Sequence, residues 1–178
     1  MKTIKLHDKE FRLLIKGELI DKEIKRVAEE INRDMKDKEP IFISVLNGSF
    51  MFTSDLLKHI DLKNTEVSFI KFTSYCGTNS TDRINSLIGL NEEIKGKNVV
   101  ILEDMIDTGK SMEHLIGSLQ AKEPASIRIA TMFFKPKALK TGRVPDYNAM
   151  ILENDFVVGR GLDYDGLGRN FPDLYIIC

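Results

Sequence analysis

Hydrophobic residues along the chain follow a helical period in some segments and a continuous run in others. Between about residues 20 and 35, apolar residues beginning at Ile24 recur at i, i+3, i+4 and i+7 among charged ones, which predicts an amphipathic helix. Residues 41–46, IFISVL, predict a strand that is buried on both faces. The turn at 47–49, NGS, leads into a second helix. The pattern therefore predicts a strand, a turn and a helix in succession.

The same order returns further along the chain. Residues 99–102, VVIL, predict a second buried strand, which is followed by an acidic, glycine-containing turn and a helix with apolar residues in register from Met112 to Leu119. A third strand is expected at 127–134. Strands that alternate with helices favour an α/β fold, a mostly parallel central sheet flanked by helices, with ligands bound beyond the carboxyl ends of the strands.

The remaining segments are shorter. Apolar runs at 67–72 and 84–89 enclose the polar stretch 73–82, which we expect to be a mobile loop. After Leu139, short apolar runs and a glycine-rich tail indicate short strands and turns that lie close to a ligand. A length of 178 residues with 42% hydrophobic residues favours a single domain.

Charge and cysteine content exclude several classes of function. The 26 basic and 27 acidic residues give a net charge of -1, so there is no overall positive field for nucleic acid or an anionic membrane. Cys76 and Cys178 form no disulfide framework, and no signal peptide or membrane-spanning run is expected, which favours the cytoplasm. The three histidines have no metal-ligand spacing, and no zinc site is predicted.

The turn within residues 99–112, VVILEDMIDTGKSM, carries the candidate chemistry. Glu103 and Asp104 end a buried strand and can accept hydrogen bonds from a vicinal diol, directly or through metal-bound water. Residues 107–111, DTGKS, begin a helix whose amides, hydroxyls and macrodipole favour a phosphate. A nucleoside-triphosphate loop is the competing interpretation, but its first glycine would fall at Asp104. The turn predicts a sugar phosphate.

This segment resembles the phosphoribosyl-pyrophosphate signature of the type I phosphoribosyltransferases. The segments 45–52 (VLNGSFMF), 71–78 (KFTSYCGT) and 155–170 (DFVVGRGLDYDGLGRN) are similar to other ligand-binding segments of the hypoxanthine-guanine branch. The resemblance implies a core at about 20–150 and a small hood from about 1–19 and 151–178. It also implies that phosphoribosyl pyrophosphate and a 6-oxopurine, hypoxanthine and also guanine, become IMP or GMP and pyrophosphate with Mg2+ as the cofactor.

The resemblance assigns roles around the central turn. Glu103 and Asp104 would hold the ribose hydroxyls, and Asp107 would act as general acid/base on the purine; a bare helix N-cap is its alternative role. The 5-phosphate would be bound by Thr108, Gly109, Lys110 and Ser111.

The leaving pyrophosphate would contact Leu46, Asn47, Gly48 and Arg169. Many relatives carry a lysine at the position of Asn47, so this chain lacks that charge. Outside the family context, the Asn-Gly pair is usually a simple turn and Arg169 a surface residue. Asp163 would be a magnesium ligand together with Glu103 and Asp104.

For the base, the resemblance assigns Lys135, Phe156, Val157 and Asp163. A lysine only donates hydrogen bonds, so Lys135 would match a 6-oxo group and disfavour the amino group of adenine. Phe156 would stack on the base, although a core position is its alternative. Arg160 stands where many relatives carry an aromatic residue, which predicts a different rim for the base pocket.

Ser74 and Tyr75 would belong to a lid that excludes water from the reacting centre. The family resemblance suggests a homodimer or homotetramer. Two rivals remain: a regulatory binding protein that keeps the fold as a sensor, which would need a basic face or an extra domain, and a transferase for adenine or a pyrimidine, which Lys135 opposes.

Overall fold

The computed structural model describes residues 3–73 and 85–178. The expected lid residues Ser74 and Tyr75 therefore lie outside the described part of the chain. In chain order the elements are β1 (Thr3–Leu6), β2 (Lys9–Ile15), α1 (Gly17–Asp34), β3 (Ile41–Leu46), α2 (Phe50–Leu57), β4 (Glu66–Thr73), β5 (Asn85–Ile88), β6 (Asn98–Ile106), α3 (Lys110–Gln120), β7 (Ser126–Phe134), β8 (Tyr147–Ile151), β9 (Val157–Val158) and β10 (Leu174–Ile177).

The central sheet has the strand order β5-β4-β3-β6-β7-β8. The neighbours from β4 to β8 all pair in parallel, and only β5 runs antiparallel, against β4. Parallel neighbours need crossover connections. Helix α2 lies between β3 and β4, α3 lies between β6 and β7, and residues 135–146, which contain no helix or strand, lead from β7 to β8. The predicted α/β fold with a mostly parallel sheet is confirmed.

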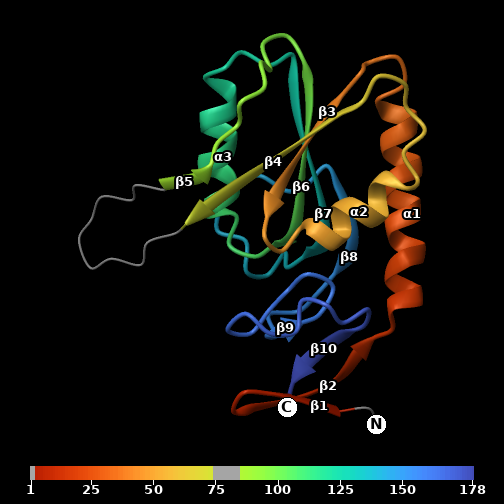
Figure 1. The fold of residues 1–178 in the computed structure, drawn as a ribbon, viewed down its shortest axis with the longest axis vertical. Helices are drawn as coiled ribbons and strands as arrows, with labels where there is room; N and C mark the ends of the chain where they lie inside the picture. Colours follow the sequence, from red (N-terminus) through yellow and green to blue (C-terminus); the bar gives the residue numbers. More distant parts are fainter. Residues whose placement is uncertain (1–2, 74–84) are drawn as a thin grey trace.

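Helices cover both faces of this sheet (Figure 1). On one face, α1 and α2 pack over residues such as Phe42, Val100 and Met132. On the other, α3 packs over Ile43, Ile101 and their neighbours. Successive residues of β3 therefore contribute to different cores, which explains why the strand is apolar throughout. No helix in the described ranges is long and apolar enough to cross a membrane.

A second, antiparallel sheet is built from the two ends of the chain. Its strand order is β1-β2-β10-β9, and a small core that includes Phe11, Val158 and Tyr175 underlies it. In Figure 1 this sheet lies below the central sheet, on the side toward which the arrow of β3 points. The family resemblance implies a hood at the chain ends, but the sequence does not predict its strands β1, β2 and β10. These strands are only four to seven residues long, and so short an alternation of apolar and polar residues is a weak signal.

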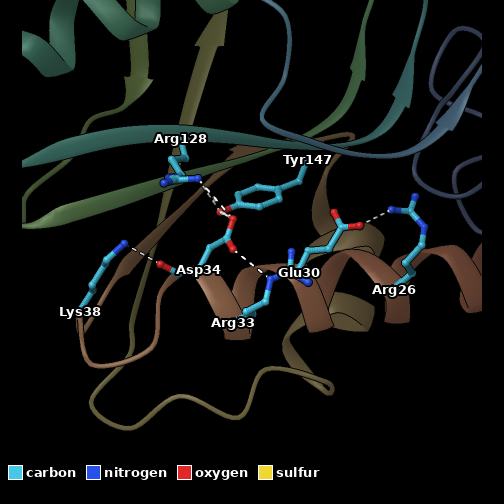
Figure 2. A network of polar contacts seen from close by, with 7 residues as sticks. All are labelled: Arg26, Glu30, Arg33, Asp34, Lys38, Arg128 and Tyr147. Carbon is cyan, nitrogen blue, oxygen red and sulfur yellow. Dashed lines mark hydrogen bonds and ion pairs between the residues drawn. The ribbon is translucent and has the colours of Figure 1, made fainter.

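A polar network ties the end of α1 to the sheet (Figure 2). The hydroxyl of Tyr147 donates to a carboxylate oxygen of Asp34 at 3.2 Å, and Arg128 lies 3.4 Å from the same oxygen. Arg128 also donates to the Tyr147 hydroxyl at 3.1 Å. Burial raises the pKa of Tyr147 to about 12, so the phenol stays a donor at any physiological pH.

The start of α1 is in backbone contact with the hood. The Gly17 amide donates to the Asp173 carboxylate at 2.9 Å. A β-carbon at Gly17 would lie only 2.5 Å from the backbone oxygen of Pro172. This junction therefore has no room for a side chain.

We expect Gly17→Ala to lower the free energy of unfolding by about 1–3 kcal/mol, because the new methyl group forces the hood away from α1. For a chain of this size that is roughly 2–4 °C of melting temperature per kcal/mol. Gly117→Ala in α3 is the matched control, since nothing lies within 4 Å of its added β-carbon and alanine favours helix. A Gly17→Ala protein that melts at or above the wild-type temperature would contradict the tight junction.

Candidate active site

The candidate residues follow three neighbouring parallel strands. The loop after β3 contains Asn47, β6 ends in Glu103–Ile106, and Lys135 follows β7 directly. Because β3, β6 and β7 are adjacent and parallel, their carboxyl ends meet at one edge of the sheet. The Lys135 amide also donates to the Ile106 backbone oxygen at 2.9 Å, which keeps the ends of β6 and β7 together.

The turn between β6 and α3 has the geometry of an anion site. Gly109 precedes α3 in a left-handed conformation, with φ 78°, and no side chain caps the helix. The first-turn amides of a helix have no acceptor within the helix, so here they are available to an anion. A pocket at this turn is lined by Glu103, Met105, Ile106, Asp107, Thr108, Gly109, Ser111 and Met112.

The acidic pair at the end of β6 is electrostatically strained. Burial raises the pKa of Glu103 well above its ordinary value, and the neighbouring Asp104 charge raises it further. Burial also raises the pKa of Asp104, against lowering contributions from hydrogen bonds and from Arg169. Two desolvated carboxylates side by side favour a cation or a hydrogen-bond donor between them.

Asp107 is not a helix cap. Its carboxylate lies 3.8 Å from the ammonium of Lys135, and that ammonium also donates to the Asp155 backbone oxygen at 2.9 Å. Lys135 is buried, with 6% of its surface exposed, whereas Asp107 is half-exposed. The solvated alternative considered for Lys135 is thus excluded, and a buried donor stands beside an accessible carboxylate.

The loop after β3 contacts both the acidic pair and the hood. The Leu46–Asn47 peptide bond is cis. A β-carbon on Gly48 would lie 1.4 Å from an oxygen of the Asp104 carboxylate. From the other side, a β-carbon on Gly161 would lie 1.9 Å from the Gly48 backbone oxygen. Three segments that are distant in sequence are therefore packed together at Gly48.

Buried hydroxyl groups support this loop from beneath. Ser44 Oγ lies 2.7 Å from both Ser49 Oγ and Thr53 Oγ1. Ser49 Oγ also donates to the Val45 backbone oxygen at 2.5 Å. All three hydroxyl residues are buried, so the chain of hydrogen bonds joins β3 to the first turns of α2 where water does not compete.

Arg169 is held in the hood by two contacts. Its guanidinium donates to the Gly161 backbone oxygen at 2.7 Å and lies 2.6 Å from Asp163 Oδ1. The other Asp163 oxygen accepts the Gly166 amide at 2.8 Å. Arg169 also lowers the pKa of Asp104 through its charge, so the arginine lies close enough to influence the acidic pair.

An exposed aromatic face stands above the same edge. Phe156 is 46% exposed, although an edge-to-face contact with Tyr164 and a tilted contact with Phe11 hold its ring, at 5.8 Å and 6.3 Å between centroids. The core alternative for Phe156 therefore does not apply. Val157 is buried in β9 and presents its backbone beside Phe156.

Comparisons with known proteins agree with this geometry. Residues 14–165 match the model of the phosphoribosyl transferase domain. The chain is 37% identical over 167 residues to a hypoxanthine-guanine-xanthine phosphoribosyltransferase of Tritrichomonas foetus, covering 93% of this chain and 91% of the relative. It is 35% identical to a hypoxanthine-guanine phosphoribosyltransferase of Streptococcus pneumoniae, covering 93% and 92%. The structure of a hypoxanthine phosphoribosyltransferase of Staphylococcus aureus superposes with a TM-score of 0.88 at 32% identity, covering 94% and 91%.

The chain belongs to the phosphoribosyl transferase family.

In this phosphoribosyltransferase, the structure brings together most residues that the sequence singled out. The acidic pair, the 107–111 turn and Lys135 lie at one sheet edge. The loop 46–48 contacts that edge through Gly48, and the hood brings Asp163 and Arg169 to it. Their individual roles stay predictions.

Arg160, which stands where many relatives carry an aromatic residue, is buried. Its side chain forms ion pairs with Asp21 of α1 and Asp55 of α2. The difference expected at the rim of the base pocket stays a prediction. With φ 54°, Arg160 directs its side chain toward the helices, and two carboxylates there compensate its charge.

Sequence reasoning missed several residues around the phosphoribosyltransferase site. One weak signal marks three of them: they are small polar residues inside or beside apolar runs. They are Ser44, Ser49 and Thr53. Asp21 and Asp55 gave none, because exposed-looking acids on amphipathic helices are common and their partner lies more than 100 residues away in sequence.

We expect Glu103→Gln to stabilise the ligand-free protein at neutral pH. Because burial raises the pKa of Glu103, the folded state keeps a proton that the unfolded chain releases above the ordinary value of 4.5. Stability is therefore lost as pH rises from 4.5 toward the folded pKa. Glutamine removes this loss, and the melting temperature at pH 7.5 should rise by ~2 °C or more.

Melting curves between about pH 4 and 8, recorded in a chelator without substrate, measure this effect. Glu29→Gln is the control, since Glu29 is an exposed residue of α1. A Glu103→Gln protein that keeps the wild-type slope of stability against pH would show that Glu103 is already ionised without penalty.

Proposed function

We propose that this chain transfers the 5-phosphoribosyl group of phosphoribosyl pyrophosphate to N9 of hypoxanthine, and also of guanine, giving IMP or GMP and pyrophosphate in purine salvage. The observation that carries the proposal is the pairing of Asp107 with buried Lys135 at 3.8 Å, beside an uncapped helix N-terminus. The carboxylate can accept a proton from a purine nitrogen, the buried ammonium can donate to a 6-oxo group, and the helix N-terminus can bind a 5-phosphate.

The proton and the base are handled by the same pair. As purine N9 forms its bond to C1 of the ribose, the bond from C1 to pyrophosphate breaks and N7 gives up a proton, which the Asp107 carboxylate accepts. Lys135 donates to the 6-oxo group, which gains negative charge as N7 is deprotonated. General acid-base catalysis of this kind contributes about 10² to 10⁴ in rate, and Phe156 offers an exposed face for stacking.

The 5-phosphate and pyrophosphate have separate sites in this proposal. Thr108, Gly109, Lys110 and Ser111 bind the phosphate through amides and hydroxyls at the start of α3. Leu46, Asn47 and Gly48 bind pyrophosphate mainly through backbone groups, because Asn47 offers no charge. Arg169 supplies that charge instead, and its planar guanidinium suits phosphate oxygens.

Magnesium fits the residues present. Among residues 3–73 and 85–178 there is no cluster of three or more protein ligands for a metal. Mg2+ usually takes only one or two carboxylates and keeps its waters and substrate oxygens. Burial raises the pKa values of Glu103 and Asp104, so a nearby cation would stabilise their ionised forms. Asp163, which lies 2.6 Å from Arg169, would contact the same ion through a water molecule. When bound, the ion neutralises charge that develops on pyrophosphate.

We infer that the chain works as a homodimer or homotetramer in the cytoplasm. Val67 and Phe69 lie on the same face of β4 and are both exposed. Two large apolar side chains on one strand face favour contact with another subunit. The sensor alternative is disfavoured, because Asp107 and Lys135 are arranged for chemistry as well as binding.

The first test supplies magnesium, phosphoribosyl pyrophosphate and one base at a time: hypoxanthine, guanine, xanthine or adenine. We expect turnover of hypoxanthine and guanine and none of adenine. Asp107→Asn should lower kcat for hypoxanthine by about 10²–10⁴, while the exposed surface change Asp61→Asn should leave it unchanged. Tight binding of phosphoribosyl pyrophosphate without turnover of any base would favour the sensor.

Lys135 determines base choice in this proposal. Replacing it by glutamine removes a charged donor worth roughly 1.5–3 kcal/mol, so kcat/KM for hypoxanthine should fall about 10–100-fold. KM for phosphoribosyl pyrophosphate should stay within about twofold. Lys137→Gln is the control, since Lys137 is exposed and pairs only with Glu153 among the described contacts. A variant whose kcat/KM for hypoxanthine stays within about twofold of the wild type, with adenine still inert, would argue against a role of Lys135 in base choice.

A further inference from the structure

The hood carries a buried arginine that no role in the proposed reaction uses. Arg160 is 4% exposed. Its Nη2 forms an ion pair with Asp21 of α1 and lies 3.3 Å from Asp55 Oδ2 of α2. Arg160 belongs to the segment after β9, so this one side chain joins the hood to both helices on one face of the core.

The site of Arg160 is costly to maintain. Its Nε is buried and has no hydrogen-bond acceptor among the described residues. Its backbone has φ 54°, a left-handed conformation that is unfavourable for a residue with a side chain. The side chain of Asp21 is 57% exposed and that of Asp55 is 23% exposed, so solvent screens these ion pairs and the net stability that they add is small. We therefore look for the effect of this arrangement in where it holds the neighbouring hood residues, and not in the stability of the fold.

What is positioned is the next residue, Gly161. Its amide donates to the Arg169 backbone oxygen at 2.9 Å, and the Arg169 guanidinium donates back to the Gly161 oxygen at 2.7 Å. Gly161 also lies against the backbone oxygen of Gly48 in the loop after β3. A shift of Arg160 would move Arg169 relative to that loop.

We propose that Arg160, clamped by Asp21 and Asp55, is a positioning residue that fixes Arg169 and Gly161 at the distance from the loop 46–48 that pyrophosphate requires. It acts on the pyrophosphate end of the site only, because Asp107 and Lys135 are held by strands β6 and β7 of the core. The inference rests on the proposed function. It adds a specific expectation: loosening the clamp weakens pyrophosphate binding and leaves the base and the 5-phosphate largely unaffected.

The test compares Arg160→Met, Arg160→Lys and Asp55→Asn with the wild type. Magnesium pyrophosphate is titrated into each protein by calorimetry, and KM is measured for phosphoribosyl pyrophosphate and hypoxanthine. We expect Arg160→Met to weaken pyrophosphate binding roughly tenfold or more, since displacements of about 1 Å can cost up to 10²-fold. KM for phosphoribosyl pyrophosphate should rise with it, and KM for hypoxanthine should change less than about twofold.

Arg160→Lys keeps one charge and should recover part of the affinity. Asp55→Asn should give a smaller loss of the same kind, and combined with Arg160→Met it should add little, as expected for two residues that act through one interaction. Lys58→Met is the matched control, because Lys58 is an exposed partner of the same Asp55 carboxylate, at 2.7 Å. It should leave pyrophosphate affinity unchanged.

Two results would overturn the proposal. One is a set of folded variants with lower melting temperatures but unchanged affinity for pyrophosphate, which would make the clamp purely structural. The other is an equal rise of both KM values, which would indicate general distortion. If Arg160→Met does not fold, Asp55→Asn and Arg160→Lys are judged by the same two criteria.

The titration also separates this proposal from the proposed function. A wild type that binds magnesium pyrophosphate but turns over no base would contradict the transferase activity and still allow the variants to be ranked by affinity. A wild type that turns over hypoxanthine, with variants of unchanged pyrophosphate affinity, would contradict only the clamp.

Discussion

The active site depends on the absence of a side chain at Gly48. A β-carbon there would overlap the Asp104 carboxylate, and from the other side a β-carbon on Gly161 of the hood would overlap the Gly48 backbone oxygen. Backbone contacts of this kind leave no freedom for adjustment, since protein interiors are close-packed. The separation between the loop after β3 and the hood is consequently fixed by main-chain atoms, and the Asp104 carboxylate of β6 packs against the same glycine.

Around that contact, the structure places groups that favour binding over stability. Burial raises the pKa values of Glu103 and Asp104, so ionising either carboxyl group costs free energy in the ligand-free protein. The first turn of α3 has no side-chain cap, and Arg160 is held in a left-handed conformation. Features of this type cluster at functional sites, where the rest of the fold compensates for them.

The two sheets have different tasks in this arrangement. The parallel sheet holds Asp107 and Lys135 at the ends of adjacent strands, so the distance between them follows from strand pairing. The hood brings Phe156 and Arg169, whose positions depend on how the chain ends dock. The junction at Gly17 and the ion pairs of Arg160 are two of the contacts that join the hood to the core.

Sequence alone determined the central sheet and the order of the turns that carry its candidate site residues. The apolar run 41–46 and the motif at 103–111 are both defined by residues that are neighbours in sequence. Patterns of this kind can be recognised before the fold is known. The local pattern alone does not distinguish a catalytic Asp107 from a helix cap, a base-binding Lys135 from a solvated residue, or a stacking Phe156 from a core residue. Tertiary structure decided each of these, because burial and pairing depend on segments far away in sequence. The same reason explains Arg160, whose partners Asp21 and Asp55 lie on two helices that only folding brings to the hood.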